Sequence, residues 1–369
     1  VGSVGNISYT LIGAFMGLAN GAGVVISQHY GAREDRRVHE AVHTAMVLAL
    51  IFGAVFTVLG VALAPFMLRL IDTPEDVLPD ATLYLRIYFS GSIPLLIYNL
   101  GSGILNAVGD SKRPLYFLIV SAVVNTVLDL IFVIYFRMGV AGVGWATVIA
   151  EAVSAVCVAV TLMRTGESYR LVPTELRIYR PMLRRIVQIG LPSSLQQMLV
   201  SFSNTFVQRY INGFQTACMA GWGCYNKLDQ FIMLPMSSMA MAATTFVSQN
   251  VGARQESRAT RGGYVATLLS LGITGVIALA LFIFAEPAIR LFTPDDTVIA
   301  FGALFLHNNV LFLMFNCVNH VLAGALRGRG DSKGPMIVML LSFVAIRQVY
   351  LFVVTRWVAN TPTLVGLGY

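Results

Sequence analysis

Long apolar runs separated by short polar loops make up most of the chain. Each run is long enough to cross about 30 Å of hydrocarbon as an α-helix, which takes roughly 20 residues. Ten such runs can be marked, over residues 4–27, 40–64, 80–108, 114–136, 139–163, 183–211, 217–247, 262–285, 297–326 and 335–358. Open strands cannot satisfy their backbone groups in lipid, and no two-residue alternation is present. The pattern therefore predicts about ten membrane-spanning helices.

The composition is typical of an integral membrane protein. Hydrophobic residues make up 56% of the chain and charged residues 12%, and the mean hydropathy is +0.73. A soluble domain carries roughly 25% charged residues, so this chain cannot cover itself with a water-compatible surface. The formal charge of +7 would suit a nucleic-acid partner. The basic residues, however, lie in short loops between apolar runs, and we expect no nucleic-acid binding.

Two short motifs occur twice at one separation. Ser27–Arg33 (SQHYGAR) corresponds to Ser248–Arg254 (SQNVGAR), and Gly109–Pro114 (GDSKRP) to Gly330–Pro335 (GDSKGP). Both pairs are 221 residues apart (248 − 27 and 330 − 109). A shared offset indicates two homologous halves, which is typical of alternating-access transporters. In the GDSK loops, Gly can end one helix while Asp or Ser caps the next, so we interpret them as fold devices.

The repeat also predicts a domain organisation. We expect an N-terminal lobe over 1–165, a polar connector over 166–181 and a C-terminal lobe over 182–369. At the offset of 221, the run at 183–211 has no partner in the first half, and the run at 139–163 has none in the second. We therefore expect that the parent protein has twelve helices, six in each half, and that this chain lacks the first and the last of them. Most Lys and Arg residues lie in the connector and the motif loops, which the positive-inside rule places in the cytoplasm.

Asp129 is the most informative charge inside an apolar run. It lies about eight residues from the end of its run, roughly 12 Å along a helix axis. An acid at such a depth costs at least about 2.5–3.5 kcal/mol unless it is paired or wetted, and such groups mark ion or substrate pathways. Asn125 lies one turn earlier. At the offset of 221 the pair becomes Ile346 and Tyr350, so it belongs to one half only, which favours function over scaffolding.

These motifs resemble a known family. The paired SQ-x-x-GAR and GDSK-x-P loops, Asn125–Asp129 (NTVLD) and Ala323–Gly330 (AGALRGRG) are similar to MATE (multidrug and toxic compound extrusion) transporters, most of all to their bacterial DinF-like branch. The resemblance covers essentially the whole chain. It implies an all-α integral membrane protein of two homologous helical bundles in a V-shaped arrangement. It also implies cation-coupled export of amphipathic drugs or organic cations from the bacterial cytoplasmic (inner) membrane; we expect a monomer.

The resemblance further implies a coupling site. In DinF-like members an Asn–Asp pair at this spacing lies in the N-lobe proton site. A Thr matching Thr147 and an Asn matching Asn99 accompany it, although simple interhelical hydrogen bonding also explains both. The family's other N-lobe acid lies on the first helix, which this chain does not contain. The carboxylate of the sodium-coupled NorM-like branch has no match at 198–203. We expect H⁺ as the coupling ion, with Na⁺ as the alternative, and no cofactor.

The second half holds a candidate substrate cavity formed by polar side chains within apolar runs. Its members are Gln197, Asn204, Lys227, Asp229, Asn316 and Arg347. Interhelical hydrogen bonds and buried ion pairs are the other interpretation of this set. Glu151, in the first half, is an intramembrane charge with less support.

Other chemistry is sparse. The four Cys residues lack CxxC spacing. His39 and His43 share a helix face but have no third ligand nearby in sequence, so we predict no metal site. A lipid-linked oligosaccharide flippase would need several Lys or Arg in one groove. An intramembrane enzyme would need a cluster of His, Asp or Cys at one depth, which we do not find. The sequence therefore predicts a cation-coupled antiporter with no catalytic residues.

Overall fold

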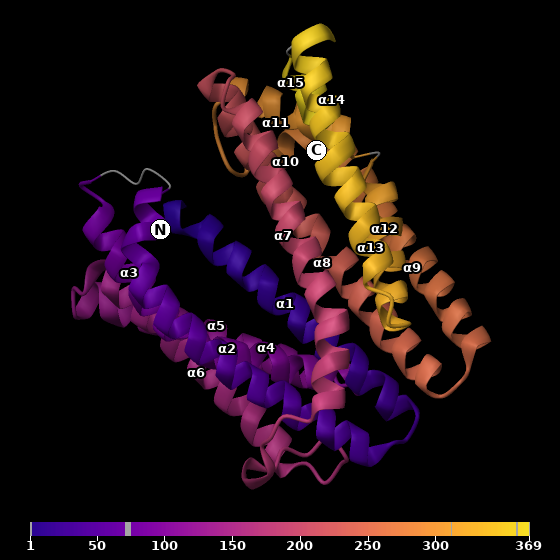
Figure 1. The fold of residues 1–369 in the computed structure, drawn as a ribbon. Helices are drawn as coiled ribbons and strands as arrows, with labels where there is room; N and C mark the ends of the chain where they lie inside the picture. Colours follow the sequence, from indigo (N-terminus) through magenta and orange to yellow (C-terminus); the bar gives the residue numbers. More distant parts are fainter. Residues whose placement is uncertain (1, 71–74, 311, 359–360, 369) are drawn as a thin grey trace. The chain divides into compact units, whose positions relative to one another are not determined.

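The structure is a computed structural model. It describes residues 2–70, 75–310, 312–358 and 361–368, with side chains for all of these except 2–12, 14–15, 70 and 202. This part of the chain is helical and contains no strand (Figure 1). Its elements form two compact units, Val1–Ser194 and Leu195–Tyr369, which divide inside one long helix. The lobe limits predicted from the sequence place the division earlier, in a connector, and stay a prediction.

The N-terminal unit is built from helices that follow the predicted runs. They are α1 (Gly2–Gly31), α2 (Asp35–Leu70), α3 (Leu78–Ser90), α4 (Ser92–Ala107), α5 (Lys112–Leu130) continued by the π-helix η1 (Ile131–Tyr135), α6 (Gly139–Arg164), the 3₁₀ turn η2 (Pro173–Glu175) and the first part of α7 (Arg180–Ile211). The run at 80–108 is two helices, α3 and α4, that meet at Gly91.

The C-terminal unit follows the same pattern. It contains the rest of α7, then α8 (Thr216–Gly252), α9 (Glu256–Ile283), α10 (Ala285–Arg290), α11 (Asp296–Asn309), α12 (Phe312–Gly328), α13 (Lys333–Met339), η3 (Leu340–Ile346), α14 (Arg347–Val353), η4 (Val354–Val358) and α15 (Pro362–Gly366). All ten apolar runs coincide with helical segments, so the prediction of about ten helices is confirmed. Six described helices are long and apolar enough to span a membrane, or seven if α11 and α12 count as one span.

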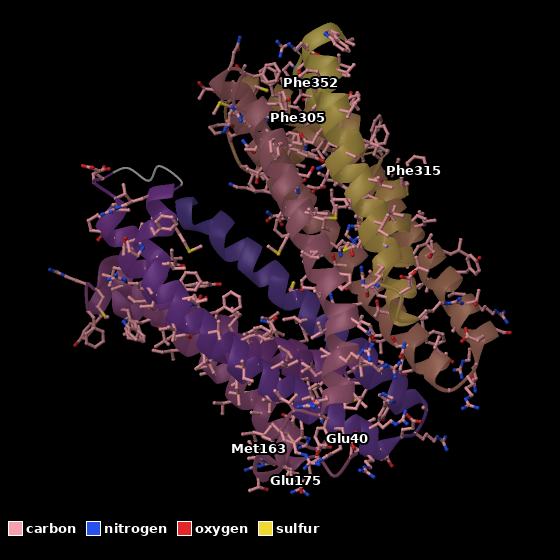
Figure 2. The ribbon with its side chains drawn as sticks, in the orientation of Figure 1. Glu40, Met163, Glu175, Phe305, Phe315 and Phe352 are labelled. Carbon is pink, nitrogen blue, oxygen red and sulfur yellow. The ribbon has the colours of Figure 1, made fainter. Side chains whose placement is uncertain are left out.

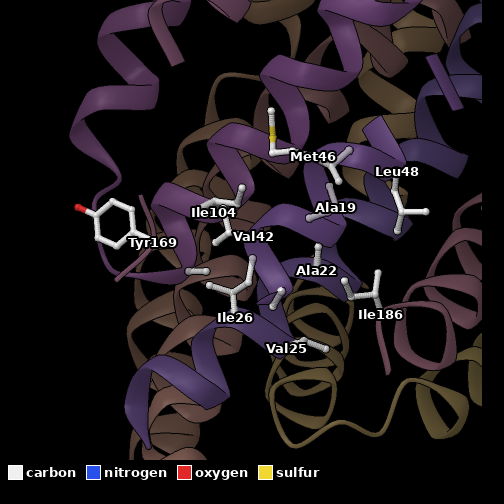
Figure 3. Close-up of a cluster of buried hydrophobic side chains, with 14 of the residues drawn as sticks. Ala19, Ala22, Val25, Ile26, Val42, Met46, Leu48, Ile104, Tyr169 and Ile186 are labelled. Atoms are coloured by element: carbon white, nitrogen blue, oxygen red, sulfur yellow. The ribbon is translucent and has the colours of Figure 1, made fainter. Parts of the chain in front are cut away.

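A buried apolar cluster holds the N-terminal unit together. Figure 3 shows side chains from α1 (Ala19, Ala22, Val25, Ile26), α2 (Val42, Met46, Leu48), α4 (Ile104), the connector (Tyr169) and α7 (Ile186) in one cluster. The connector and the first turns of α7 therefore pack on the N-terminal unit. Within lipid such packing stabilises by close van der Waals contact, because lipid tails are as apolar as these side chains.

The GDSK loops have the same geometry in both halves. Gly109 and Gly330 have φ of 94° and 92°, a left-handed conformation that favours glycine. Asp331 accepts the backbone N–H of Gly334 at 2.9 Å, and Asp110 makes the equivalent bond at 3.2 Å. Each loop thus ends one helix on its Gly and caps the next with its Asp, which confirms the interpretation as a fold device.

The SQ-x-x-GAR loops also match in detail. Arg33 and Arg254, each with φ of 57°, follow α1 and α8 in the left-handed conformation. In both halves the backbone N–H of the residue after this Arg donates a hydrogen bond to the carbonyl oxygen five residues earlier in the helix. The N···O distance is 3.0 Å in the first half and 2.8 Å in the second. This is the hydrogen bonding of a helix C-cap, which satisfies carbonyls at the helix end.

His29 connects the first of these loops to α7. Its Nδ1 lies 2.6 Å from an Oε2 of Glu34, and its Nε2 accepts a hydrogen bond from Nη1 of Arg185 at 3.3 Å. The ring is thus neutral, with its proton on Nδ1. Burial lowers the pKa of His29, which lies beyond the predicted span 4–27, and the hydrogen bond from His29 lowers the pKa of Glu34.

We expect this loop to loosen on acidification. The pKa of His29 is lower in the folded state than in the unfolded state, where it is about 6.5. The contribution of neutral His29 to the free energy of unfolding is therefore present above pH 6.5 and is lost as pH falls through the pKa of the folded state. Protonated His29 can no longer accept from Arg185. Hydrogen-exchange protection of residues 28–34, corrected for intrinsic rates, should be lower at pH 5.5 than at pH 7.5. In His29→Gln the difference should vanish; equal protection of the wild type at both pH values would contradict this account.

Candidate functional site

Three of the four predicted coupling residues lie where α5 packs against α6. Asp129 occupies the last turn of α5, and its Oδ1 is buried without a hydrogen-bond partner among the described residues. One turn earlier, Nδ2 of Asn125 lies 3.5 Å from Oγ1 of Thr147 on α6, and Thr147 donates to Val143 O at 3.0 Å. The structure thus brings Asn125 and Thr147 together across two helices, one turn from the half-buried Asp129 carboxylate.

Asn99 belongs to α4 and bonds within its own helix. Its Nδ2 donates to the carbonyl oxygen of Leu95 at 2.8 Å. This i−4 bond satisfies the amide locally, a common way for a polar side chain to be buried within a helix. The described contacts therefore include no bond from Asn99 to Asp129.

Two residues that the sequence undervalued or missed lie beside this site. Tyr84 on α3 lies within electrostatic range of the carboxyl groups of Glu151 and Asp129. The Glu151 carboxylate reaches the junction of α3 and α4, where a Cβ placed on Gly91 would lie 3.1 Å from Oε2. Glu151 could be ranked higher from the sequence, because a carboxylate within a membrane span is costly. Tyr84 carries no sequence signal of its own, because aromatic residues are common in such spans.

The π-helix η1 begins two residues after Asp129, but it is a feature of both halves. At the offset of 221, η1 corresponds to residues 352–356, which overlap η4. The π-helix η3 is different, since its counterpart at 119–125 lies in the regular helix α5. Single π turns often mark functional sites. In η3 the turn leaves the carbonyl of Phe343 to accept a hydrogen bond from Ser203 on α7.

Arg347, immediately after η3, is the centre of a polar cluster in the C-terminal unit. It is 6% exposed, and its Nη1 donates to Asn204 Oδ1 at 2.8 Å and to Ser203 Oγ at 3.3 Å. Its guanidinium lies 4.3 Å from the centroid of the Phe343 ring. Gln348 also donates to Ser203 at 3.3 Å. Two of the six predicted cavity residues, Arg347 and Asn204, are therefore in direct contact.

The other four candidate cavity residues lie on α7, α8 and α12. Lys227 on α8 is exposed, with its Nζ 5.3 Å from the centroid of the Phe292 ring. Asp229, two residues later, is buried. Gln197 on α7 is exposed, and Asn316 on α12 is half-buried. The cavity wall formed by all six residues remains a prediction.

Comparisons with known proteins give one consistent result. The MatE family model matches residues 1–131 and 192–353. The probable multidrug resistance protein YpnP of Bacillus subtilis is 29% identical, over 98% of this chain and 81% of that protein. A probable multidrug resistance protein NorM of Geobacillus kaustophilus is 27% identical, over 86% of this chain and 71% of that protein.

Solved structures show the same fold. A crystal structure of a MATE transporter in the bent conformation superposes with a TM-score of 0.92 at 20% identity, covering all of this chain and 82% of that one. A MATE transporter in complex with MaD3S has a TM-score of 0.92 at 21% identity, with 100% and 83% coverage. At these identities the likeness carries the fold alone.

Proposed function

Because the chain belongs to the MATE family of multidrug efflux transporters, we propose that it exports small amphipathic or cationic organic molecules in exchange for a cation. The family and the apolar helices make it a multi-pass membrane transporter and not an enzyme. Beyond the family, we propose that the coupling ion is H⁺ in preference to Na⁺ and that the substrates are amphipathic or cationic molecules. We further propose that transport occurs by alternating access between two homologous halves, in a bacterial inner membrane.

The observation that carries the coupling proposal is the buried Oδ1 of Asp129. A buried oxygen with no donor costs about 1–3 kcal/mol, and more when it carries charge. A proton or a sodium ion at the carboxylate removes this cost. The Asn125 and Thr147 side chains lie one turn away and offer further oxygen atoms. Asp129 is therefore suited to bind a cation in one state of the transporter and to release it in another.

Such a site couples transport only if its affinity for the cation differs between the two states. A ligand shifts a conformational equilibrium by its differential affinity and by nothing else. In this proposal, loss of the cation leaves a charge on a carboxylate whose buried Oδ1 has no hydrogen-bond donor among the described residues. Rearrangement of the surrounding helices toward water or toward a donor relieves that cost, and this rearrangement is linked to release of the drug.

Arg347 is better suited to position neighbouring groups than to bind an organic cation. Its guanidinium stays charged and would repel a positive drug. Its bonds to Ser203 and Asn204 hold α7 against the last helical run of the C-terminal unit. We propose that Arg347 orients Asn204, and that Gln197 and Asn316 contribute further polar contacts to the drug. The flippase alternative would need several Lys or Arg side chains in one groove; of its two candidates, Lys227 is exposed and Arg347 is buried.

The proposal is tested by ethidium efflux from pump-deficient bacteria that express the full-length protein. We expect faster efflux than with empty vector. A protonophore should abolish it, and removal of Na⁺ should leave it unchanged. Efflux that depends on Na⁺ would correct the ion. Efflux equal to that of empty vector would contradict the exporter proposal and direct the search to lipid-linked substrates.

Neutralising Glu151 should weaken export without abolishing it. Glu151 and Asp129 both lie within electrostatic range of Tyr84, and we infer that negative charge at Glu151 favours cation binding at Asp129. We expect Glu151→Gln to lower the initial rate of ethidium efflux by about three- to tenfold at pH 8, and by less at pH 6, where protons are abundant. Glu286→Gln, an exposed acid on α10, is the control. Equal rates for Glu151→Gln and wild type at pH 8 would exclude Glu151 from the site.

A further inference from the structure

Three metal-binding side chains meet where the connector crosses α2. His39 and His43 lie one turn apart on α2, and Glu175 is the last residue of the connector turn η2. One ligand atom from each residue lies within 4.8 Å of the other two. From the sequence alone the histidine pair had no third ligand; the tertiary fold supplies one. Figure 2 shows this end of the unit, with Glu40 of α2 and Glu175 of the connector labelled.

The two histidines are already oriented. His39 Nε2 lies 2.9 Å from Oε2 of Glu175, and the two imidazole centroids are 3.9 Å apart. His43 is fully buried, and its Nδ1 lies 2.8 Å from the carbonyl oxygen of His39. The backbone N–H of Val172 donates to His43 Nε2 at 3.1 Å, which places the lone pair on Nε2 and the proton on Nδ1; the carbonyl oxygen of Val172 also lies 3.2 Å from Nε2. The hydrogen bond from Nδ1–H to a carbonyl is the feature that fixes the tautomer of metal-bound histidines in proteins.

We propose that His39, His43 and Glu175 bind a divalent transition metal, Zn²⁺ above all. Two imidazoles and one carboxylate are a common zinc ligand set, with the remaining position open to water. Zinc holds such ligands at about 2.0–2.2 Å, so ligand atoms within 4.8 Å need to move by roughly 1 Å. The metal replaces the His39–Glu175 hydrogen bond, and it displaces the backbone N–H of Val172, which lies 3.1 Å from His43 Nε2.

The position of this site gives the metal a structural effect. The connector is attached to α2 at residue 172 through His43, and again where Tyr179 N–H donates to Thr44 Oγ1 at 3.1 Å. A metal bound through Glu175 adds an attachment between these two points. Zinc should therefore clamp the connector onto α2 within the N-terminal unit. This inference does not depend on the proposed export activity.

The test is zinc binding to the purified full-length protein after removal of metal by a chelator. Calorimetric titration should show one Zn²⁺ per chain. Glu175→Gln and His39→Gln should each weaken binding at least tenfold, since each removes a ligand. Both positions are at least partly exposed, so these variants should fold. Glu167→Gln, an exposed acid on the same connector, should bind zinc as the wild type does.

Two further readouts separate this site from adventitious zinc. Co²⁺ in place of Zn²⁺ should give visible absorption bands in the wild type that are lost in both ligand variants. Zinc should also slow hydrogen exchange at residues 172–179 in the wild type but not in Glu175→Gln. Absence of zinc binding, or equal zinc affinity in the wild type and both ligand variants, would overturn the proposal.

Discussion

Export should be abolished in Asp129→Asn, while the protein reaches the membrane at its wild-type level. Asn has nearly the volume of Asp, so the packing of α5 against α6 is retained. An amide, however, carries no charge to hold a cation and releases no proton at physiological pH. The rate of ethidium efflux, measured at matched membrane levels, should fall at least tenfold and approach that of empty vector.

The matched control is Asp80→Asn, which removes an exposed acid from the first turn of α3 in the same unit. This variant should export at close to the wild-type rate. If Asp129→Asn also exports at the wild-type rate, Asp129 serves structure alone and coupling belongs to other residues. Loss of export together with loss of the protein from the membrane would indicate a folding role for Asp129.

Gly324→Val should prevent the C-terminal unit from folding. A Cβ at Gly324 on α12 would lie 2.5 Å from the carbonyl oxygen of Ala240 on α8. That atom belongs to the backbone, so it can move only if the two helices separate. Separation would also break the 2.9 Å bond from Thr244 Oγ1 to the carbonyl of Gly324. Overpacking costs typically about 1–3 kcal/mol even where side chains can adjust, so the loss here should be larger. Size-exclusion chromatography should show aggregate in place of the monodisperse wild type.

The control for this variant is Gly272→Val on α9, where a Cβ would meet no atom within 4 Å. It should give a monodisperse protein that unfolds at close to the wild-type temperature. A Gly324→Val protein with wild-type thermal stability would contradict the close packing of α8 and α12. The same packing recurs in the N-terminal unit, where Gly103 faces Ala19 at the offset of 221, although at a looser 3.5 Å.

The helices and the repeat could be predicted because lipid leaves a chain few alternatives. Every buried backbone group must bond within its own element, so each long apolar run reads as a helix. The repeated loops could be interpreted because caps depend on local residues, such as Gly330 with its positive φ and Asp331 with its bond to the next turn. The junction of α3 and α4 at Gly91 could not be predicted, because the apolar run continues across it without a polar break.

The candidate site could be predicted only in part. Asp129 was identifiable because a carboxylate in an apolar run is costly. Tyr84 was not, because its proximity to Glu151 depends on how α3 packs against α6. Asn99 was assigned to the site by resemblance, whereas in the structure its amide bonds to its own helix. Glu175 meets His39 only through the path of the connector, which no local pattern encodes.

Cation exchange linked to drug export can be measured most directly in proteoliposomes that contain the full-length protein and a pH-sensitive dye. An outwardly or inwardly directed ethidium gradient is imposed, and internal pH is recorded. We predict that movement of the drug drives protons in the opposite direction, and that Asp129→Asn shows neither flux. Drug movement by the wild type without any flux of protons or sodium would contradict the account.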